Sequence, residues 1–495
     1  MVIKDIKRIS KNSLGFTFGF LLTTAISFFL LPIYTRYLTP ADYGIISVAA
    51  VLSSLISIIS FFGMRSAINR FFYNYQGEGS EFREFISTIW ISVTSFAVFL
   101  SILLTIFGII IFSIIFPDLP FYPYILLVIW TTFFTIPFSI SLSLLQMRER
   151  SFAFGLLCVL QFITNALLII FFVVGFHEGA LGSLKGQFFS AIIFFIIGLY
   201  YLKPDISIQL NIQKFKEAIK FGLPLLPHEL AGWITTQLNR IFLSVFTTLS
   251  TVGIFSLGYQ FGSLLCILTG AINLAWIPYF MSTAQEEGEN AKPKFAGLVV
   301  YYLCIIFFAG LGIILFAPNM IRILTTPSFY PAIQVVPLIV FAFLFDGMYY
   351  ICANNLFFAK KTGYLSFSTI SGAIVSIILS FLLIHTFGIY GAAVSLLCSY
   401  AWTFGLAFYF SNKLYPIPYE YNKMGKIVLI FTITVVLSII IPYYGFIVDI
   451  ALKVIILGIF LLGLILSRVL SITELNLGKK YALETIQDLR ISRKN

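Results

Sequence analysis

Residues 85–112 read FISTIWISVTSFAVFLSILLTIFGIIIF and contain no charged side chain. About 20 apolar residues in a helix cross the hydrocarbon core of a bilayer, so this stretch predicts a transmembrane helix. Similar runs recur along all 495 residues, of which 59% are hydrophobic and 10% are charged, whereas a soluble domain carries about 25% charged residues. The sequence therefore predicts an all-α polytopic membrane protein. It argues against a soluble enzyme, a disordered chain and a nucleic-acid-binding domain.

We expect about 14 transmembrane helices joined by short loops. The first apolar run, Leu14–Leu38, is too long for the core of a signal peptide and lacks a small-residue cleavage site, so we expect it to be a span. The predicted ranges are 13–38, 41–63, 85–112, 120–145, 152–175, 180–202, 217–247, 252–281, 295–317, 330–358, 363–386, 388–412, 425–443 and 446–467.

The basic residues predict the orientation of the chain. With the N-terminus in the cytoplasm, 26 of the 31 Lys and Arg residues fall in segments that are predicted to lie inside. Cytoplasmic loops of membrane proteins carry such an excess of Lys and Arg. We therefore expect both termini in the cytoplasm. The basic residues predicted to lie outside are Arg36, Lys185, Arg322 and Lys453.

Two pairs of glycine-led strings suggest an internal repeat. The strings GIIS at 44–47 and GIFS at 253–256 are 209 residues apart, and GALG at 179–182 and GIYG at 388–391 have the same offset. A single pair of short strings can recur by chance, but here two pairs share one offset. This shared offset predicts two parallel, pseudo-symmetric six-helix lobes around a central cavity, plus two C-terminal helices. The predicted divisions are an N-lobe at 1–202, a cytoplasmic linker at 203–216, a C-lobe at 217–413, the extra helices at 414–467 and a basic cytoplasmic tail at 468–495.

No motif for catalysis or metal binding is present in the sequence. It contains no H-E-x-x-H and no Walker P-loop, and its five cysteines form no C-x-x-C pair. Membrane enzymes that act on the outer face generally need a substantial external loop with acidic or basic catalytic groups. The longest predicted external loop, 317–330, has Arg322 as its only charged residue. We therefore expect no enzyme activity, no cofactor and no metal ion.

The segment at 31–44, LPIYTRYLTPADYG, resembles the beginning of the polysaccharide-biosynthesis flippases. These are the Wzx-like members of the multidrug/oligosaccharidyl-lipid/polysaccharide (MOP) exporter superfamily. Residues 239–257 and on to Pro278 are similar to the seventh and eighth helices of this family, in which many members carry an acid where Asn239 stands. Thr39, with Pro40 and Asp42 after it, also predicts a capping box at the start of the second helix.

The resemblance implies a flippase for a polyprenyl-diphosphate-linked oligosaccharide. It would move this lipid by alternating access from the cytoplasmic to the outer face of a bacterial plasma (inner) membrane, for O-antigen or capsule biosynthesis. Membrane lipids and polysaccharide polymerase machinery are then the expected partners, nucleic acid is not, and we expect a monomer. The alternative is a cation-coupled multidrug exporter of the same superfamily. Those exporters usually have twelve spans, so the two extra helices favour a flippase.

The candidate site residues follow from the anionic diphosphate, which the planar fork of an arginine can bind through two oxygens. Glu229, Trp233, Thr236 and Arg240 share one face of the seventh predicted helix. Because charge facing lipid is costly, we predict that this face lines the cavity and that Arg240 binds the diphosphate. The alternative for Arg240 is snorkelling to the interface. Further candidates for diphosphate or sugar binding are Arg36, Arg65, Arg70, Gln260 and Asn273.

Asp346 is the candidate for ion coupling, because it lies in the middle of the tenth predicted helix, where an unpaired carboxylate is expensive. The alternative is a structural pair or hydrogen bond. Pro32 in the first helix, and Pro224 and Pro227 near the start of the seventh, remove backbone donors and predict hinges.

Overall fold

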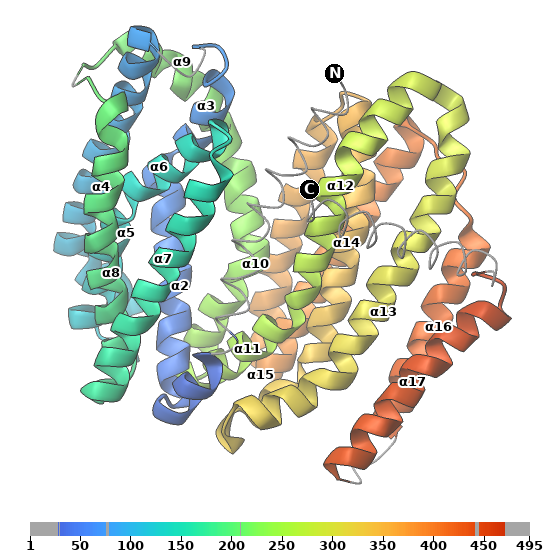
Figure 1. Cartoon of the computed structure of the whole chain (residues 1–495). Coiled ribbons are helices and arrows are strands. Elements are labelled where there is room, and N and C mark those ends of the chain that lie inside the picture. Colours follow the sequence, from blue (N-terminus) through green and yellow to red (C-terminus); the bar gives the residue numbers. More distant parts are fainter. Residues whose placement is uncertain (1–27, 29, 76–78, 208, 441–444, 471–495) are drawn as a thin grey trace, which may run out of the picture. The chain divides into compact units, whose positions relative to one another are not determined.

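The computed structural model describes residues 28, 30–75, 79–207, 209–440 and 445–470, and all regular structure in this part of the chain is helical (Figure 1). The predicted all-α class is therefore confirmed. The α-helices are α2 (Pro40–Phe61), α3 (Met64–Phe71), α4 (Gly79–Ile115), α5 (Leu126–Phe134), α6 (Ile136–Met147), α7 (Ser151–Ile170), α8 (Gly179–Leu202), α9 (Ile212–Gly222), α10 (Leu226–Phe246), α11 (Leu249–Gly262), α12 (Leu264–Glu287), α13 (Lys292–Leu324), α14 (Val336–Phe358), α15 (Gly363–Leu414), α16 (Tyr421–Ile440) and α17 (Phe446–Leu466).

Within the described residues, ten helical stretches are long and apolar enough to cross a bilayer. One of them, 249–324, contains α11, α12 and α13, and another is the 52-residue α15, which bends at Gly388. The predicted spans from 41–63 onward each overlap described helical structure. The first predicted span, 13–38, and the tail at 468–495 lie mostly outside the described residues.

The seventh predicted span, 217–247, differs from the structure. It is divided into α9, which ends at Gly222, and α10, which begins at Leu226, with a 3-10 turn between them. Pro224 lies in this turn and Pro227 in the first turn of α10, where a missing backbone N–H breaks no helical hydrogen bond. The predicted linker 203–216 likewise contains the start of α9, because the Asn211 side chain caps that helix.

The chain packs as two compact units. Unit 1 comprises 1–259, 321–335 and 366–403, and unit 2 comprises 260–320, 336–365 and 404–495. This grouping reflects packing and not the internal repeat, so the predicted lobe boundaries stay a prediction.

The two extra C-terminal helices, α16 and α17, pack against each other in unit 2 (Figure 1). Asp449 on α17 pairs with Lys453 at 2.6 Å and accepts a hydrogen bond from Asn319 on α13 at 2.7 Å. A buried carboxylate needs such partners. This polar contact therefore fixes α17 against α13.

Unit 1 contains a reciprocal crossing of two helix starts. A Cβ atom on Gly44 would lie 1.8 Å from the carbonyl oxygen of Leu249, and one on Gly253 would lie 2.0 Å from that of Pro40. Leu249 and Gly253 follow Pro40 and Gly44 by the 209-residue offset. Each helix start therefore makes the contact that its counterpart makes, as a two-fold relation requires.

Two more features recur at this offset. Thr39 and Asp42 form the predicted capping box, in which the Asp42 N–H donates to Thr39 Oγ1 at 3.2 Å. The Thr251 N–H donates to Thr248 Oγ1 in the same way at 3.3 Å. Gly388, where α15 bends, has φ +53°, and its counterpart Gly179 at the start of α8 has φ +57°.

A Gly44→Ala substitution is expected to destabilise the protein by about 3 kcal/mol, because the added Cβ would collide with backbone that cannot rotate away. The thermal unfolding midpoint in detergent measures this effect. The matched control is Gly312→Ala on α13, where a Cβ atom meets nothing within 4 Å. Equal midpoints for the two variants would contradict the close crossing.

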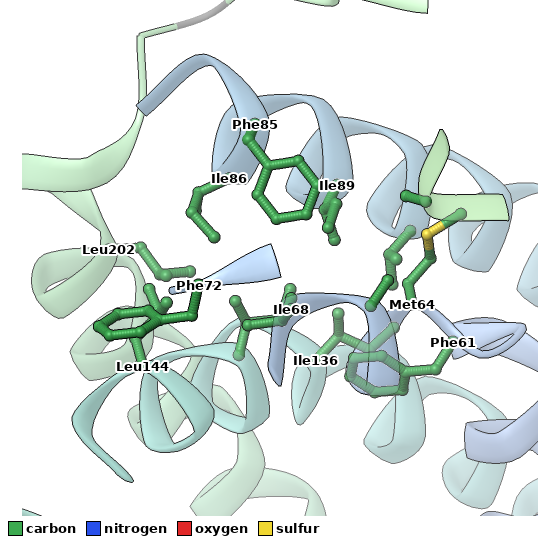
Figure 2. Packing of buried hydrophobic residues seen from close by; sticks show 14 of the residues in the cluster. Phe61, Met64, Ile68, Phe72, Phe85, Ile86, Ile89, Ile136, Leu144 and Leu202 are labelled. Carbon is green, nitrogen blue, oxygen red and sulfur yellow. The ribbon is translucent and has the colours of Figure 1, made fainter. Parts of the chain in front are cut away.

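A buried apolar cluster in unit 1 holds α3 in place (Figure 2). Its residues come from α2, α3, α4, α6, α8 and α9 and include Phe61, Met64, Ile68, Phe85, Ile89, Ile136, Leu144 and Leu202. The side chains of Arg65 and Arg70, on the same short helix, are exposed. The cluster thus fixes the backbone that presents these two arginines.

Candidate functional site

The polar face of α10 is directed at α2 and α3 of unit 1. The Trp233 indole N–H donates to Ser54 Oγ on α2 at 2.8 Å. Ser66 on α3 donates to a Glu229 carboxylate oxygen at 3.3 Å. The sequence spacing predicted that these side chains share one face, and the fold places protein rather than lipid opposite this face.

Arg240 is 8% exposed and lies on α10 next to α11. Its Nε donates to Ser256 Oγ at 3.1 Å, and its Nη1 donates to the Thr236 carbonyl oxygen at 3.4 Å and to Gln237 Oε1. The guanidinium lies 4.3 Å from the ring centroid of Tyr259. Among the described residues, no carboxylate lies within ion-pair distance of Arg240. Within the described part of the chain, the groups that contact this positive charge are neutral.

A second basic position lies where α3 meets α10. The Arg65 guanidinium lies 4.5 Å from the Phe61 ring centroid and close enough to Glu229 for electrostatic attraction. Arg240 follows Glu229 by eleven residues, which is about 16 Å along a helix at 1.5 Å per residue. Arg65 therefore lies beside the first turn of α10, whereas Arg240 lies farther along the same helix. The structure does not bring these two arginines into contact.

The other predicted arginines of unit 1 are exposed. Arg36 is exposed near the end of the helical residues 30–37, which include Pro32. Arg70 is also exposed and donates to Asn74 Oδ1 at 3.1 Å.

Asn273 belongs to unit 2, where it lies on α12 and accepts a hydrogen bond from Asn354 Nδ2 on α14 at 2.9 Å. It lines a small pocket of about 10 Å³ together with Trp276, Tyr302 and Tyr350. This volume has room for about one water molecule and is too small for a sugar in this conformation. Gln260, at the end of α11, also belongs to unit 2.

Asp346 lies on α14. It interacts electrostatically with the hydroxyls of Tyr302 and Tyr350, which line this pocket, so the carboxylate lies beside the pocket. It makes no hydrogen bond or ion pair with any other described residue. No group of three or more His, Cys, Asp or Glu side chains that could hold a metal ion occurs in the part of the chain described here. The candidate for ion coupling is thus a single carboxylate among tyrosines.

Residues 9–284, more than half of the chain, match the profile of the family described as polysaccharide biosynthesis protein. The chain belongs to this family. It is 23% identical over 289 residues to Lsg locus putative protein 1 of Haemophilus influenzae, which covers 57% of this chain and 68% of that protein. It is 19% identical over 234 residues to the probable low-salt glycan biosynthesis flippase Agl15 of Haloferax volcanii. That match covers 46% of this chain and half of the length of the relative.

Solved structures show the same fold. An inward closed conformation of the lipid II flippase MurJ aligns with a TM-score of 0.72 over 90% of this chain and 97% of that chain, at 16% identity. An inward-facing multidrug resistance MATE family transporter of the MOP superfamily aligns with a TM-score of 0.62 over 78% of this chain and 93% of that chain, at 15% identity. The fold of this polysaccharide biosynthesis family member is thus the MOP exporter fold, as the sequence predicted.

Sequence reasoning missed several groups around the site of this family member. Tyr259 and Ser256 contact Arg240 from α11, and no local pattern distinguishes them from the many other aromatic and hydroxyl residues. Asn239 is 1% exposed, and its Oδ1 accepts a hydrogen bond from Ser380 on α15 at 2.6 Å. The Asn239 Nδ2 has no partner among the described residues. The position at which the resemblance implies an acid is therefore a buried amide here.

Proposed function

We propose that this protein is a flippase that moves a polyprenyl-diphosphate-linked oligosaccharide from the cytoplasmic to the outer face of the bacterial plasma membrane. Family membership supports a role in surface polysaccharide biosynthesis, either O-antigen or capsule. The relative named as a glycan biosynthesis flippase supports translocation rather than enzyme catalysis. The exporter fold supports alternating access.

The observation that carries the proposal is that Arg240 is buried and has no carboxylate partner among the residues that the structure describes. Burying an unpaired charge costs several kcal/mol, so such a group is retained when a ligand of opposite charge compensates it. A diphosphate matches the guanidinium fork with two oxygens. The neutral neighbours, Ser256 and Tyr259, orient the fork and do not compete for its charge.

The other candidates take roles along the transport path in this proposal. Arg65 and Arg70 receive the diphosphate at the cytoplasmic side, while Glu229 attracts Arg65 when no substrate is bound. Transport then brings the diphosphate toward Arg240. Further roles are sugar contacts for Gln260 and Asn273, an outer-face contact for Arg36, ion coupling for Asp346, and hinges at Pro32, Pro224 and Pro227.

The alternative is a cation-coupled multidrug exporter, which the TM-score of 0.62 to a MATE transporter favours. Two observations make the flippase the better proposal. The chain belongs to the polysaccharide biosynthesis family, and α16 and α17 correspond to the two spans that are predicted in addition to the twelve that drug exporters usually have. A buried arginine also disfavours a cationic drug, because like charges repel at close range.

A deletion strain tests the proposed function. Its extracted lipids are expected to contain a polyprenyl diphosphate that carries a complete oligosaccharide, and mass spectrometry of that lipid would identify the glycan. The wild-type gene on a plasmid should remove the accumulated lipid. An intact surface polysaccharide without accumulation would reject the flippase and favour the drug exporter.

A further inference from the structure

Unit 1 also has a basic cleft, whose lining residues are different from those of the polar face of α10. It is a cleft of about 540 Å³ that is open to solvent, at the end of the unit where α4 begins and α6 and α8 end. Four basic side chains and one acid line it, and these are Arg83, Arg148, Arg150, Lys203 and Asp205. The lining therefore has a net charge of about +3.

Arg148 is the fixed member of this group. Its two Nη atoms donate to the two carboxylate oxygens of Asp205 at 2.8 and 2.6 Å, and Asp205 is 4% exposed. The guanidinium also lies 5.7 Å from the ring centroid of Phe82 on α4. A bidentate pair of this kind fixes the orientation of the arginine. The pair thus joins the end of α6 to the turn after α8 and forms one wall of the cleft.

The other three basic side chains lack such partners. Arg83, Arg150 and Lys203 are exposed, and none of them forms a side-chain hydrogen bond or ion pair with another described residue. Three like charges around one cleft repel each other, and an anion in the cleft would remove this repulsion. The lining thus provides three cationic side chains that pair with no carboxylate among the described residues.

The rest of the lining indicates what kind of anion fits. Buried Leu144 and Leu145 provide an apolar wall, and the Tyr200 side chain at the edge is 74% exposed. Tyrosine is enriched at the level of lipid headgroups, where its ring is in an apolar region and its hydroxyl in a polar one. A basic edge over an apolar wall suits a phosphate that is attached to an acyl or prenyl chain better than a free soluble anion.

We propose that this cleft binds the phosphate group of a membrane lipid. The lipid is either an anionic phospholipid or the polyprenyl diphosphate carrier, because both present a phosphate at the same depth. The phospholipid case does not depend on the proposed transport activity, whereas the carrier case rests on it. On the orientation predicted from the basic residues, the cleft faces the cytoplasmic leaflet, whose anionic lipids attract basic segments.

Native mass spectrometry of the full chain in detergent tests this proposal with three lipid probes. The probes are phosphatidylglycerol, neutral phosphatidylcholine and undecaprenyl diphosphate. The cleft variant carries Arg83→Gln, Arg150→Gln and Lys203→Gln, and it leaves the Arg148–Asp205 pair intact. The control variant removes three exposed lysines that do not line the cleft, with Lys216→Gln, Lys220→Gln and Lys361→Gln.

The expected result is that phosphatidylglycerol binds the cleft variant at least about tenfold more weakly than the wild type, since basic residues near a lipid surface attract anionic headgroups. Phosphatidylcholine binding and the control variant should be unchanged. A selective loss of undecaprenyl diphosphate, with phosphatidylglycerol unaffected, would assign the cleft to the carrier lipid. Equal losses in both variants, or no loss for either phosphorylated lipid, would overturn the proposal. Size-exclusion chromatography and thermal unfolding confirm that both variants are folded.

Discussion

Replacing Arg240 by glutamine is expected to lower export of the lipid-linked glycan about 100-fold, while the protein remains folded in the membrane. Hydrogen bonds to a charged group contribute about 1.5–3 kcal/mol each, so losing the bidentate contact to a diphosphate removes about 3 kcal/mol. Folding should survive, because no described carboxylate depends on Arg240 for its charge. The amount of lipid-linked glycan that accumulates in a complemented deletion strain measures the effect.

Three control variants separate the charge of Arg240 from its packing. Arg240→Lys keeps the charge without the planar fork, and we expect it to retain partial export. Tyr259→Phe keeps the ring that lies against the guanidinium and should export almost normally. Arg322→Gln removes an exposed arginine elsewhere in unit 1 and should have no effect. Normal export by Arg240→Gln would remove Arg240 from the proposed diphosphate site.

Replacing Asp346 by asparagine is expected to abolish export that depends on an ion gradient. The two side chains have the same shape, but the amide can neither take up a proton nor neutralise a bound cation. Asp346 has no hydrogen-bond or ion-pair partner among the described residues, so the substitution leaves no counter-charge exposed in the membrane. Export rates in proteoliposomes with and without an imposed proton or sodium gradient measure the effect.

A matched control uses Asp118→Asn, which removes an exposed carboxylate between two helices and should leave gradient dependence unchanged. Asp346→Glu keeps a titratable group at the same position and is expected to restore part of the gradient response. Full gradient-driven export by Asp346→Asn would show that this carboxylate has a structural role or none.

The spans could be predicted from the sequence because the bilayer imposes a minimum apolar length. The predicted helix 85–112 lies within α4, Gly79–Ile115, and the predicted cap formed by Thr39 and Asp42 is present. Local turns were less accessible to prediction. Pro224 signalled an irregularity near the start of the seventh span, but hydropathy alone did not reveal the 3-10 turn that separates α9 from α10.

The candidate site was predictable only in part, because sequence spacing gives the face of a helix and not its neighbours. The spacing grouped Glu229 and Arg240 on one face of α10, whereas the contacts to Ser66 and Tyr259 depend on how other helices pack. The cleft is a stronger example. Its basic residues lie up to 120 positions apart, and in the sequence they were only part of the cytoplasmic excess of positive charge. Their proximity follows from the packing of α4, α6 and α8.

The side of the membrane on which the lipid-linked glycan accumulates tests the central claim most directly. In spheroplasts of the deletion strain, we predict that a glycan-binding lectin added outside does not reach the accumulated lipid, and that it does so after the membrane is permeabilised. Spheroplasts that carry the wild-type gene should present the glycan to the lectin without permeabilisation. Equal labelling of intact deletion and wild-type spheroplasts would contradict the claim that this protein moves the lipid across the membrane.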